Sequence, residues 1–378
     1  MVRSPRGLIL LLMVVSLLLL VDLGRHFLAD RRIGRHSLIT LESAVTPETV
    51  AIDGHTFAVT GASVREVRSD RISLRAWTPT PTIRVVEPEG GGEVTVEVDN
   101  LPRRMQLEAS GPVQEGRAGL LRTLRFAPQI TRRLGFADQA REVTFAVLGD
   151  TGDSPTFLRA LRLAASHGAD FLLLAGDLIY LDAQIPHLRD ILASTPLPIF
   201  IARGNHDYRN ETRITFMRQL SPPYYTFRLG GATFIILDNA DSYLPTLWWR
   251  STQYHWLTTV LSLPAVGPLF VVMHKPPFDP RPKPQRQAMA DTGFAQALMR
   301  HFARAGVDAV FAGHIHASHR WTHDGIPYVI SGEGFASPEG VRQNHLAWVH
   351  VRGWNVTITQ KPIWDTPDTG ASHSADMR

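Results

Sequence analysis

Short apolar runs, each ended by polar residues, constrain the fold of this chain more than any other feature. Six such runs follow residue 141, and each leads through Gly, Asp, Asn or His into a helical pattern. The runs are Val143–Leu148, Phe171–Ala175, Pro198–Ala202, Thr233–Leu237, Leu269–Met273 and Ala309–Ala312. Continuous apolar runs of this length are typical of strands buried on both faces. Their alternation with helical segments predicts an α/β fold.

Capping residues predict where three helices lie. Ser154 suits the N-cap position, Pro155 suits the first helical position, and Gly168 follows the end of that segment. A second helix is expected to begin near Ser251. A third is expected over residues 291–305, with Gly306 after its end.

Residues 37–140 have the alternating pattern of strands with one solvated face. Arg71–Trp77 and Glu93–Val98 alternate polar and apolar residues, and turn-forming clusters such as Asp99–Pro102 separate these segments. This pattern predicts a small antiparallel, fibronectin III-like β-sandwich. Its arginines indicate either an anion-binding face or a solvated one; they are Arg103, Arg104, Arg122, Arg125, Arg132 and Arg133.

The first 36 residues contain a hydrophobic segment. Leu8–Val21 is an apolar run behind Arg3 and Arg6, as in export signals and membrane anchors. A helix of this length spans about 21 Å, less than the roughly 30 Å of a hydrocarbon core, and no good cleavage site follows. We expect a signal or a membrane anchor here, with the rest of the chain membrane-anchored or exported and outside the cytoplasm.

Five of the six apolar runs are followed by side chains that can bind metal ions or transfer protons. The clusters are Gly149–Asp153, Gly176–Tyr180, Gly204–Asp207, His274 and Gly313–His316. Because ligands bind beyond the carboxyl ends of strands in α/β sheets, the clusters are expected to converge on one edge. Glycine before a polar residue lets the backbone turn sharply at the strand tip. The repetition predicts a single shared site.

The residue types limit what this site can bind. The chain has 0 Cys, which excludes disulfides, thiolate metal sites and cysteine nucleophiles. Carboxylates, an amide, a phenol and imidazoles suit Fe, Zn, Mn or Mg, and two such ions sharing a carboxylate can clamp a phosphoryl group. A net charge of +4 gives no support for specific nucleic-acid binding. The sequence also lacks a G-x-x-x-x-G-K-[ST] loop, a G-x-S-x-G elbow and an H-E-x-x-H motif.

The clusters resemble the calcineurin-like metallophosphoesterases, whose blocks are Asp-x-His, Gly-Asp, Gly-Asn-His-Asp/Glu, His and Gly-His-x-His. The resemblance covers roughly residues 143–361. Gly152 replaces the histidine of the first block, and Tyr180 follows Asp177 by three residues, as in the purple acid phosphatase branch. The resemblance implies a two-sheet sandwich flanked by helices (α/β/β/α) and preceded by a small all-β domain. We therefore expect a signal or anchor at 1–36, a β-sandwich at 37–140, a metallophosphoesterase domain at 141–364 and a disordered tail at 365–378.

The resemblance also implies a metal-binding role for seven residues. The first metal ion would be held by Asp150, Tyr180 and His316, the second by Asn205, His274 and His314, with Asp177 as the bridge. The branch holds Fe(III) at the tyrosinate position, with Fe(II), Zn or Mn beside it. A metal-bound hydroxide would attack phosphorus in line.

Other residues would assist these ligands. His206, oriented by Asp207, would bind the phosphoryl oxygen or protonate the leaving group. Asp153 and Asn239 would either orient ligands or serve as ordinary turn residues. In the loop after His274, which lacks the further histidines of some purple acid phosphatases, Lys275 or Arg281 would either contact phosphate or face solvent.

The function implied is hydrolysis of phosphate esters. A phosphomonoesterase of the acid phosphatase type, acting on a phosphorylated small molecule or protein, is the first expectation. A phosphodiesterase or nucleotide hydrolase is the alternative, because metal ligands determine the reaction centre whereas loops choose the substrate. The loops concerned are residues 208–213 and 275–287. The remaining alternative is a binding scaffold that holds no metal.

Overall fold

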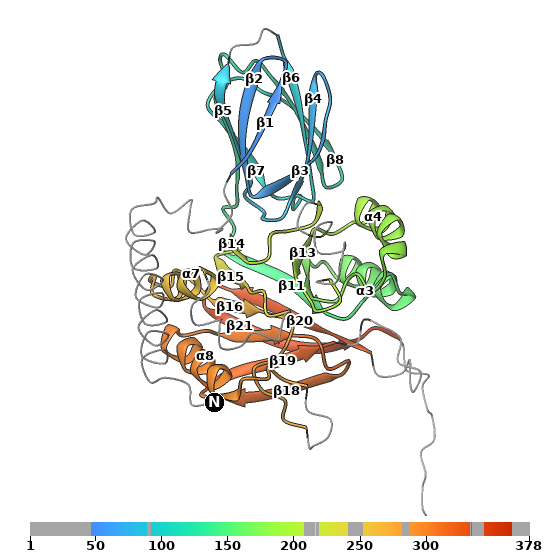
Figure 1. Ribbon diagram of the computed structural model, residues 1–378, viewed down its shortest axis with the longest axis vertical. Helices are drawn as coiled ribbons and strands as arrows, with labels where there is room; N and C mark the ends of the chain where they lie inside the picture. The colour runs from blue at the N-terminus through green and yellow to red at the C-terminus, as the bar shows by residue number, and fades with distance from the viewer. Residues whose placement is uncertain are drawn as a thin grey trace, which may run out of the picture.

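The computed structural model describes residues 47–88, 92–207, 219–240, 252–281, 287–332 and 344–364, together with Phe216 and Gly334. They form an all-β unit and a larger unit of strands and helices (Figure 1). The predicted signal or anchor at 1–36 and the predicted tail at 365–378 lie outside these residues. Within them, no helix combines the length and apolarity needed to cross a bilayer.

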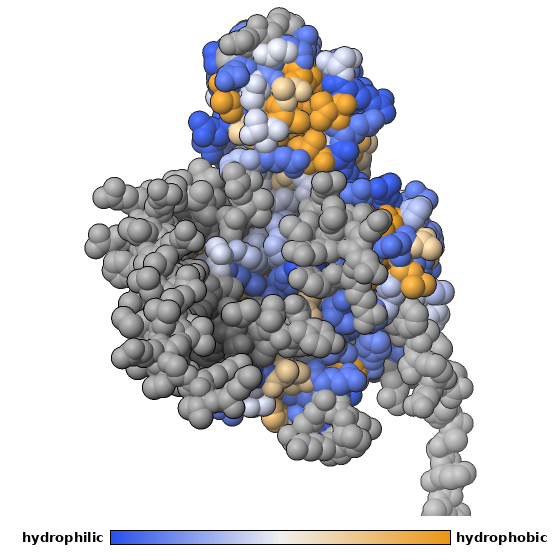
Figure 2. Space-filling model, in the orientation of Figure 1, coloured by the Kyte–Doolittle hydropathy of each residue, from blue (hydrophilic) through white to orange (hydrophobic). Residues whose placement is uncertain are grey.

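The all-β unit is a sandwich of two five-stranded sheets. One sheet has the order β1 (Glu48–Ile52), β2 (His55–Thr60), β5 (Thr82–Pro88), β10 (Arg133–Ala137) and β7 (Gln106–Ala109). The other has the order β3 (Ala62–Val67), β4 (Arg71–Ala76), β6 (Val94–Asp99), β9 (Leu121–Phe126) and β8 (Gln114–Ala118). Figure 2 shows hydrophobic residues gathered on the face of this unit that is turned to the viewer.

One pairing in the sandwich differs from the prediction. β4 runs parallel to β6, whereas the sequence predicted antiparallel sheets. The chain leaves this sheet after β4, contributes β5 to the opposite sheet, and then returns as β6. Because one crossing strand separates the two, β6 enters the first sheet in the same direction as β4.

The larger unit also contains two sheets. The first has the order β13 (Ile199–Ala202), β12 (Phe171–Ala175), β11 (Glu142–Leu148), β20 (His345–Arg352) and β21 (Asn355–Pro362). The second has the order β14 (Tyr225–Leu229), β15 (Ala232–Ile236), β16 (Leu269–Val272), β17 (Ala309–Ala312), β19 (Ile326–Ser331) and β18 (Ser318–His323). All six predicted runs are strands. In the first sheet β13, β12 and β11 pair in parallel, and β20 and β21 continue it in antiparallel pairs. In the second sheet the four inner strands pair in parallel and the edge strands β14 and β18 pair antiparallel.

Helices cover the outer faces of these two sheets. α3 (Pro155–Ser166) and α4 (Ile185–Ser194) pack on the sheet of β11, and α7 (Thr252–Leu261) and α8 (Thr292–Ala305) pack on the sheet of β16. Ser154 caps α3 as predicted, since its Oγ accepts the Phe157 amide at 3.1 Å. The sequence pattern missed α4, whose N-cap residue, Gln184, does not cap the helix with its side chain. The layers agree with the predicted two-sheet α/β sandwich.

Phenylalanine rings fill the space between the two sheets. The ring of Phe145 stacks on Phe171 at 5.1 Å and meets Phe234 edge-on at 5.1 Å. The same core includes Phe200, Phe227, Phe270 and Phe311, all at most 1% exposed. Full burial of each ring contributes roughly 2–3 kcal/mol, so this layer holds the two sheets at a constant spacing.

Buried hydrogen bonds join the sandwich to the larger unit. Asn100, at φ 67°, donates through Nδ2 to the carbonyls of Ala76 and Ile199, and its Oδ1 accepts the Ile199 amide at 2.9 Å. Arg104 forms ion pairs with Asp138 and Asp170 across the same joint. Arg104 therefore belongs to neither the anion-binding face nor the solvated face that the sequence left open. Strands before residue 138 pair only with one another, as do those from residue 142 onward, and we propose the domain boundary at 140/141 on this ground.

Candidate metal centre

The five polar clusters lie beyond the carboxyl ends of β11, β12, β13, β16 and β17. Backbone hydrogen bonds hold neighbouring clusters together: the Asp150 amide donates to Gly176 O at 2.9 Å, and the Gly313 amide donates to His274 O at 3.0 Å. The two sheets meet where the His314 amide donates to Asp150 Oδ2 at 2.8 Å. The convergence on one edge that the strand pattern predicted is thus present.

Four of the predicted metal ligands have a strained backbone. Asp150, Asp177, His314 and His316 have φ values of 56°, 55°, 69° and 45°. Side chains other than glycine lose roughly 1–2 kcal/mol in this left-handed region. Only seven non-glycine residues of the described chain have positive φ, and four of them are in this site. Strain concentrated in this way is typical of functional sites, where the surrounding fold imposes it.

Five of the predicted ligands form two groups of donor atoms. Asp177, His274 and His314 place one atom each within 4.8 Å of one another, and so do Asp150, Asp177 and His316. Asp177 belongs to both groups, which is the position the sequence assigned to a bridge. Asp150, Asp177 and His274 are buried, whereas His316 is 53% exposed and lies at the entrance.

His274 is held by backbone atoms so that one ring nitrogen faces the site. Its Nδ1 lies 2.8 Å from the carbonyl of Ala175, which can only accept, so Nδ1 carries a proton. Its Nε2 lies 3.0 Å from Asn205 Oδ1 and 3.3 Å from Asp177 Oδ2. Asn239 Oδ1 accepts the His274 amide at 2.9 Å. Asn239 therefore positions His274 rather than serving only as a turn residue.

Charges within the cluster shift the ionisation of its members. Burial opposes the charged form of Asp177, but the attraction of His274 and the amide bond from His206 outweigh it and lower the pKa to about 2. Burial also opposes protonation of His274, yet the charge of Asp177 raises its pKa to about 9. Burial and the neighbouring His274 lower the pKa of His314 to about 3. At neutral pH His314 is the uncharged imidazole, the form that coordinates metal ions.

Tyr180 lies beside the two groups and packs against His206. Their ring centroids are 4.3 Å apart. Burial raises the pKa of Tyr180, and the charges of Asp150 and Asp177 raise it further. The phenol oxygen would therefore ionise only with a cation close by.

A glutamine that the sequence pattern did not indicate holds the backbone of Tyr180. Gln184, in the short 3₁₀ helix η1 (Asp182–Gln184), accepts the amides of Tyr180 and Leu181 through Oε1, both at 2.9 Å. Its Nε2 donates to Asp153 Oδ1 at 2.5 Å, and His187 contacts the other oxygen of Asp153 at 3.1 Å. Asp153 thus acts through Gln184 to position Tyr180. No motif marks Gln184, because its contacts depend on how the two loops meet.

Asp207 joins the loops after β12 and β13. Its Oδ2 accepts the amides of Asp177 and Gly204 at 2.9 and 2.8 Å, and its Oδ1 accepts the Ile179 amide at 2.7 Å. The sequence predicted that Asp207 orients His206. These three contacts join its carboxylate to backbone amides of the two loops. They hold the loop of Asp177 and the loop of Asn205 in fixed positions relative to one another.

The cations after His274 are largely buried or paired. Lys275 is 7% exposed. Arg281 forms a two-pronged ion pair with Asp279, through Nε at 3.0 Å and Nη2 at 2.9 Å, and its Nη1 lies 3.4 Å from the carbonyl of Ile315. The pairing places Arg281 beside the loop that carries His314 and His316.

The donor set fits a pair of cations. Asp150 Oδ1 is buried and accepts no hydrogen bond from any described residue; the Nε2 of His316 lies 3.4 Å away. Burial raises the pKa of Asp150, because a carboxylate charge without a nearby cation is unfavourable in the protein interior. A bound cation would offset this charge. Carboxylate, imidazole, amide and phenol ligands without sulfur suit iron, zinc or manganese.

Comparisons with known proteins agree with this geometry. Residues 143–318 match the family model described as calcineurin-like phosphoesterase. The serine/threonine-protein phosphatase CPPED1 of Danio rerio is 30% identical over 43% of this chain and 58% of its own length. The purple acid phosphatase 21 of Arabidopsis thaliana is 30% identical over 47% of this chain and 45% of its own length. The chain thus spans about half the length of these curated relatives.

A solved structure shares the fold across both units. The purple acid phosphatase PPD1 from yellow lupin (Lupinus luteus) seeds superposes with a TM-score of 0.50 at 11% identity, covering 81% of this chain and 72% of that one. At this identity the likeness concerns the fold alone. The family match assigns residues 143–318 to the calcineurin-like phosphoesterases, and both ligand groups that share Asp177 lie within this segment.

Proposed function

We propose that this chain is a binuclear metal-dependent hydrolase of phosphate esters and that phosphomonoesters are its substrates. The observation that carries the proposal is the pair of ligand groups that share Asp177. Two metal ions held there lower the pKa of a water molecule and offset the negative charge of a phosphoryl group. Asp150, Tyr180 and His316 would hold one ion, and Asn205, His274 and His314 the other.

The remaining residues of the site would bind or protonate the substrate and hold the surrounding loops in place. His206 is 24% exposed, and its Nε2 lies 4.0 Å from Asp177 Oδ2, so it can reach both solvent and the metal centre. We assign it to binding the phosphoryl oxygen or protonating the leaving alkoxide. Asp207 and Asn239 maintain the loops around it through their backbone contacts.

Two observations favour monoesters and the purple acid phosphatase branch. Tyr180 follows Asp177 by three residues and packs beside the centre, as that branch requires. Both curated relatives described above bear the names of phosphatases. On this basis we propose Fe(III) at the tyrosine side, with Fe(II), Zn or Mn on the other. A phosphodiesterase with the same centre is the alternative.

The test compares two chromogenic esters. The chain is loaded with iron plus zinc or manganese, and its hydrolysis of 4-nitrophenyl phosphate is compared with that of bis(4-nitrophenyl) phosphate. Asp177→Asn serves as the blank, and Asp190→Asn, on the exposed face of α4, as the matched control. Monoester turnover that only the blank loses supports the proposal. Preference for the diester favours the alternative, and turnover that survives in the blank refutes both.

A further inference from the structure

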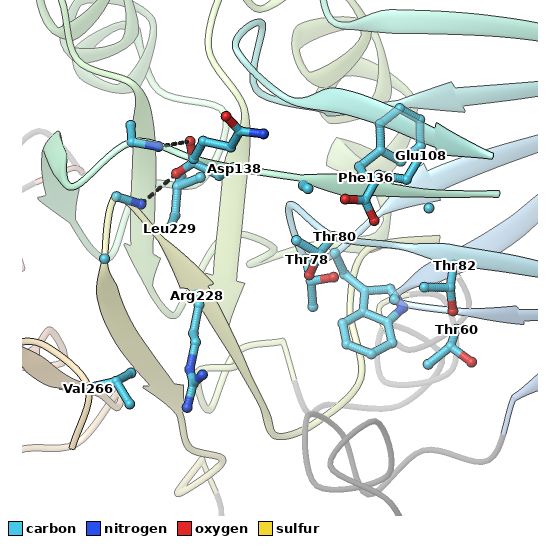
Figure 3. Close-up of a pocket in the computed structure, with 18 of the residues that line it drawn as sticks. Thr60, Thr78, Thr80, Thr82, Glu108, Phe136, Asp138, Arg228, Leu229 and Val266 are labelled. Carbon is cyan, nitrogen blue, oxygen red and sulfur yellow. Dashed lines mark hydrogen bonds between the residues drawn. The ribbon is translucent and has the colours of Figure 1, made fainter. Parts of the chain in front are cut away.

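A large hollow lies where the sandwich meets the catalytic unit, away from the metal centre. Its volume is about 620 Å³. Figure 3 shows Thr60, Thr78, Thr80 and Thr82 on the sandwich side, and Arg228, Leu229 and Val266 on the catalytic side. The catalytic wall is formed by residues that precede or connect strands, such as Arg141 before β11 and Gly231 before β15. The metal centre lies at the opposite ends of β11 and β16, so the two sites are separate.

Hydroxyl groups line the sandwich side of the hollow. Thr60 and Thr82 face each other across β2 and β5. No described residue makes a hydrogen bond to the hydroxyl of Thr60, Thr78, Thr80 or Thr82. Gly135 leaves room on this wall, since a Cβ there would meet its nearest neighbour, Thr82 Cγ2, only at 3.7 Å. The wall thus offers several free donors and acceptors beside the rings of Trp77 and Phe136.

Positive charge surrounds the hollow. Arg133, Arg141 and Arg228 line it, and none forms an ion pair with a described residue. Arg133 also lies directly across from Arg84 in β5, and opposed like charges destabilise a strand pair. On the acidic side, Asp138 is already engaged, because it accepts the amides of Gly230 and Ala140 and pairs with Arg104.

Glu108 is the remaining acidic residue of the lining. It lies opposite Gly135 in the neighbouring strand β7 and forms no ion pair with a described residue. Three arginines against one glutamate leave the hollow with a net positive charge. A carboxylate beside hydroxyl groups can also accept hydrogen bonds from a hydroxylated ligand.

We propose that this hollow binds a small anion that carries several hydroxyl groups, of the class of phosphorylated monosaccharides. Guanidinium groups pair with phosphate in a two-pronged geometry, which accounts for the arginines. Threonine hydroxyls and Glu108 match sugar hydroxyls as donors and acceptors. A volume of about 620 Å³ is within the range of small-molecule sites. The proposal does not depend on the reaction at the metal centre.

The test uses glucose 6-phosphate as the probe, with glucose and inorganic phosphate as comparison ligands. Binding is measured by calorimetry on the metal-loaded chain carrying Asp177→Asn, which prevents consumption of the probe. Gly135→Val adds a branched side chain beside Thr82 on the hydroxyl wall, and Arg228→Ala removes one charge. Arg162→Ala, an exposed arginine on α3, removes a charge elsewhere. Each substitution alone, in the otherwise unchanged chain, is expected to leave 4-nitrophenyl phosphate turnover within about twofold, because none touches the metal centre.

We expect the probe to bind at least about tenfold more tightly than glucose or inorganic phosphate. Gly135→Val should abolish binding at the hollow, Arg228→Ala should weaken it about tenfold, and Arg162→Ala should leave it unchanged. Equal affinity for inorganic phosphate and the probe would overturn the role of the hydroxyl wall. Binding that survives Gly135→Val, or no binding at millimolar probe, would overturn the site itself.

Discussion

Gln184 offers a sharp test of how the site is held. Its Oε1 accepts two backbone amides, those of Tyr180 and Leu181, and its Nε2 binds Asp153. Gln184→Ala removes the acceptor for both amides. Each such bond contributes about 1 kcal/mol net, so unfolding free energy should fall by about 1–2 kcal/mol. The larger effect is expected on the site, because loss of a residue that orients a metal ligand typically costs about 10–100-fold in activity or metal affinity.

Two readouts follow the position of Tyr180 separately from stability. One is kcat/KM for 4-nitrophenyl phosphate, and the other is the visible tyrosinate-to-iron absorption band of the iron-loaded chain. Gln360→Ala is the matched control, since Gln360 donates to Ser318 on the exposed surface. The double variant Asp153→Asn/Gln184→Glu exchanges donor and acceptor between the two side chains and should restore both readouts. An unchanged band and unchanged kcat/KM in Gln184→Ala would refute the argument.

Three further predictions concern other contacts. Tyr180→Phe should remove the visible band of the iron-loaded chain, and an absorption spectrum with the same band would exclude Tyr180 as the ligand. Asp207→Asn leaves one oxygen to accept three amides, so a urea titration should show a loss of about 3 kcal/mol, and a loss below about 1 kcal/mol would contradict this role. Asn100→Ala strips three buried bonds and puts alanine at φ 67°, so unfolding free energy should fall by about 4 kcal/mol; an unchanged midpoint of chemical unfolding would disprove it.

The parts of the fold that could be predicted have local causes. A buried strand must be apolar on both faces, so β12 and β17 have the residues expected from their apolar runs. The polar clusters could be placed on one edge because parallel strands bring their carboxyl ends together. The end of helix α8 could be placed because glycine is favoured after the last helical residue, and Gly306 indeed has φ 69°.

The parts that could not be predicted depend on contacts between distant segments. The bond from Gln184 to Asp153 joins residues 31 positions apart, and that from Asn100 to Ile199 joins residues 99 apart. Neither leaves a trace in periodicity or composition. The parallel pairing of β4 and β6 could not be predicted for the same reason. The alternation of polar and apolar residues does not show to which of the two sheets β5 belongs. The hollow between the units is likewise made by surfaces that meet only in the folded chain.

The short strand β13 links the sandwich to the candidate metal centre. The side chain of Asn100, in the sandwich, forms hydrogen bonds with both the amide and the carbonyl of Ile199, the first residue of β13. The cluster Gly204–Asp207 lies just after the last residue of the strand, Ala202. Four extended residues span only about 13 Å, and β13 pairs with β12 along its whole length at the edge of its sheet. One end of β13 is thus bonded to the sandwich, whereas Asn205 and His206 follow its other end. Removing the sandwich would leave β13 without these bonds at Ile199.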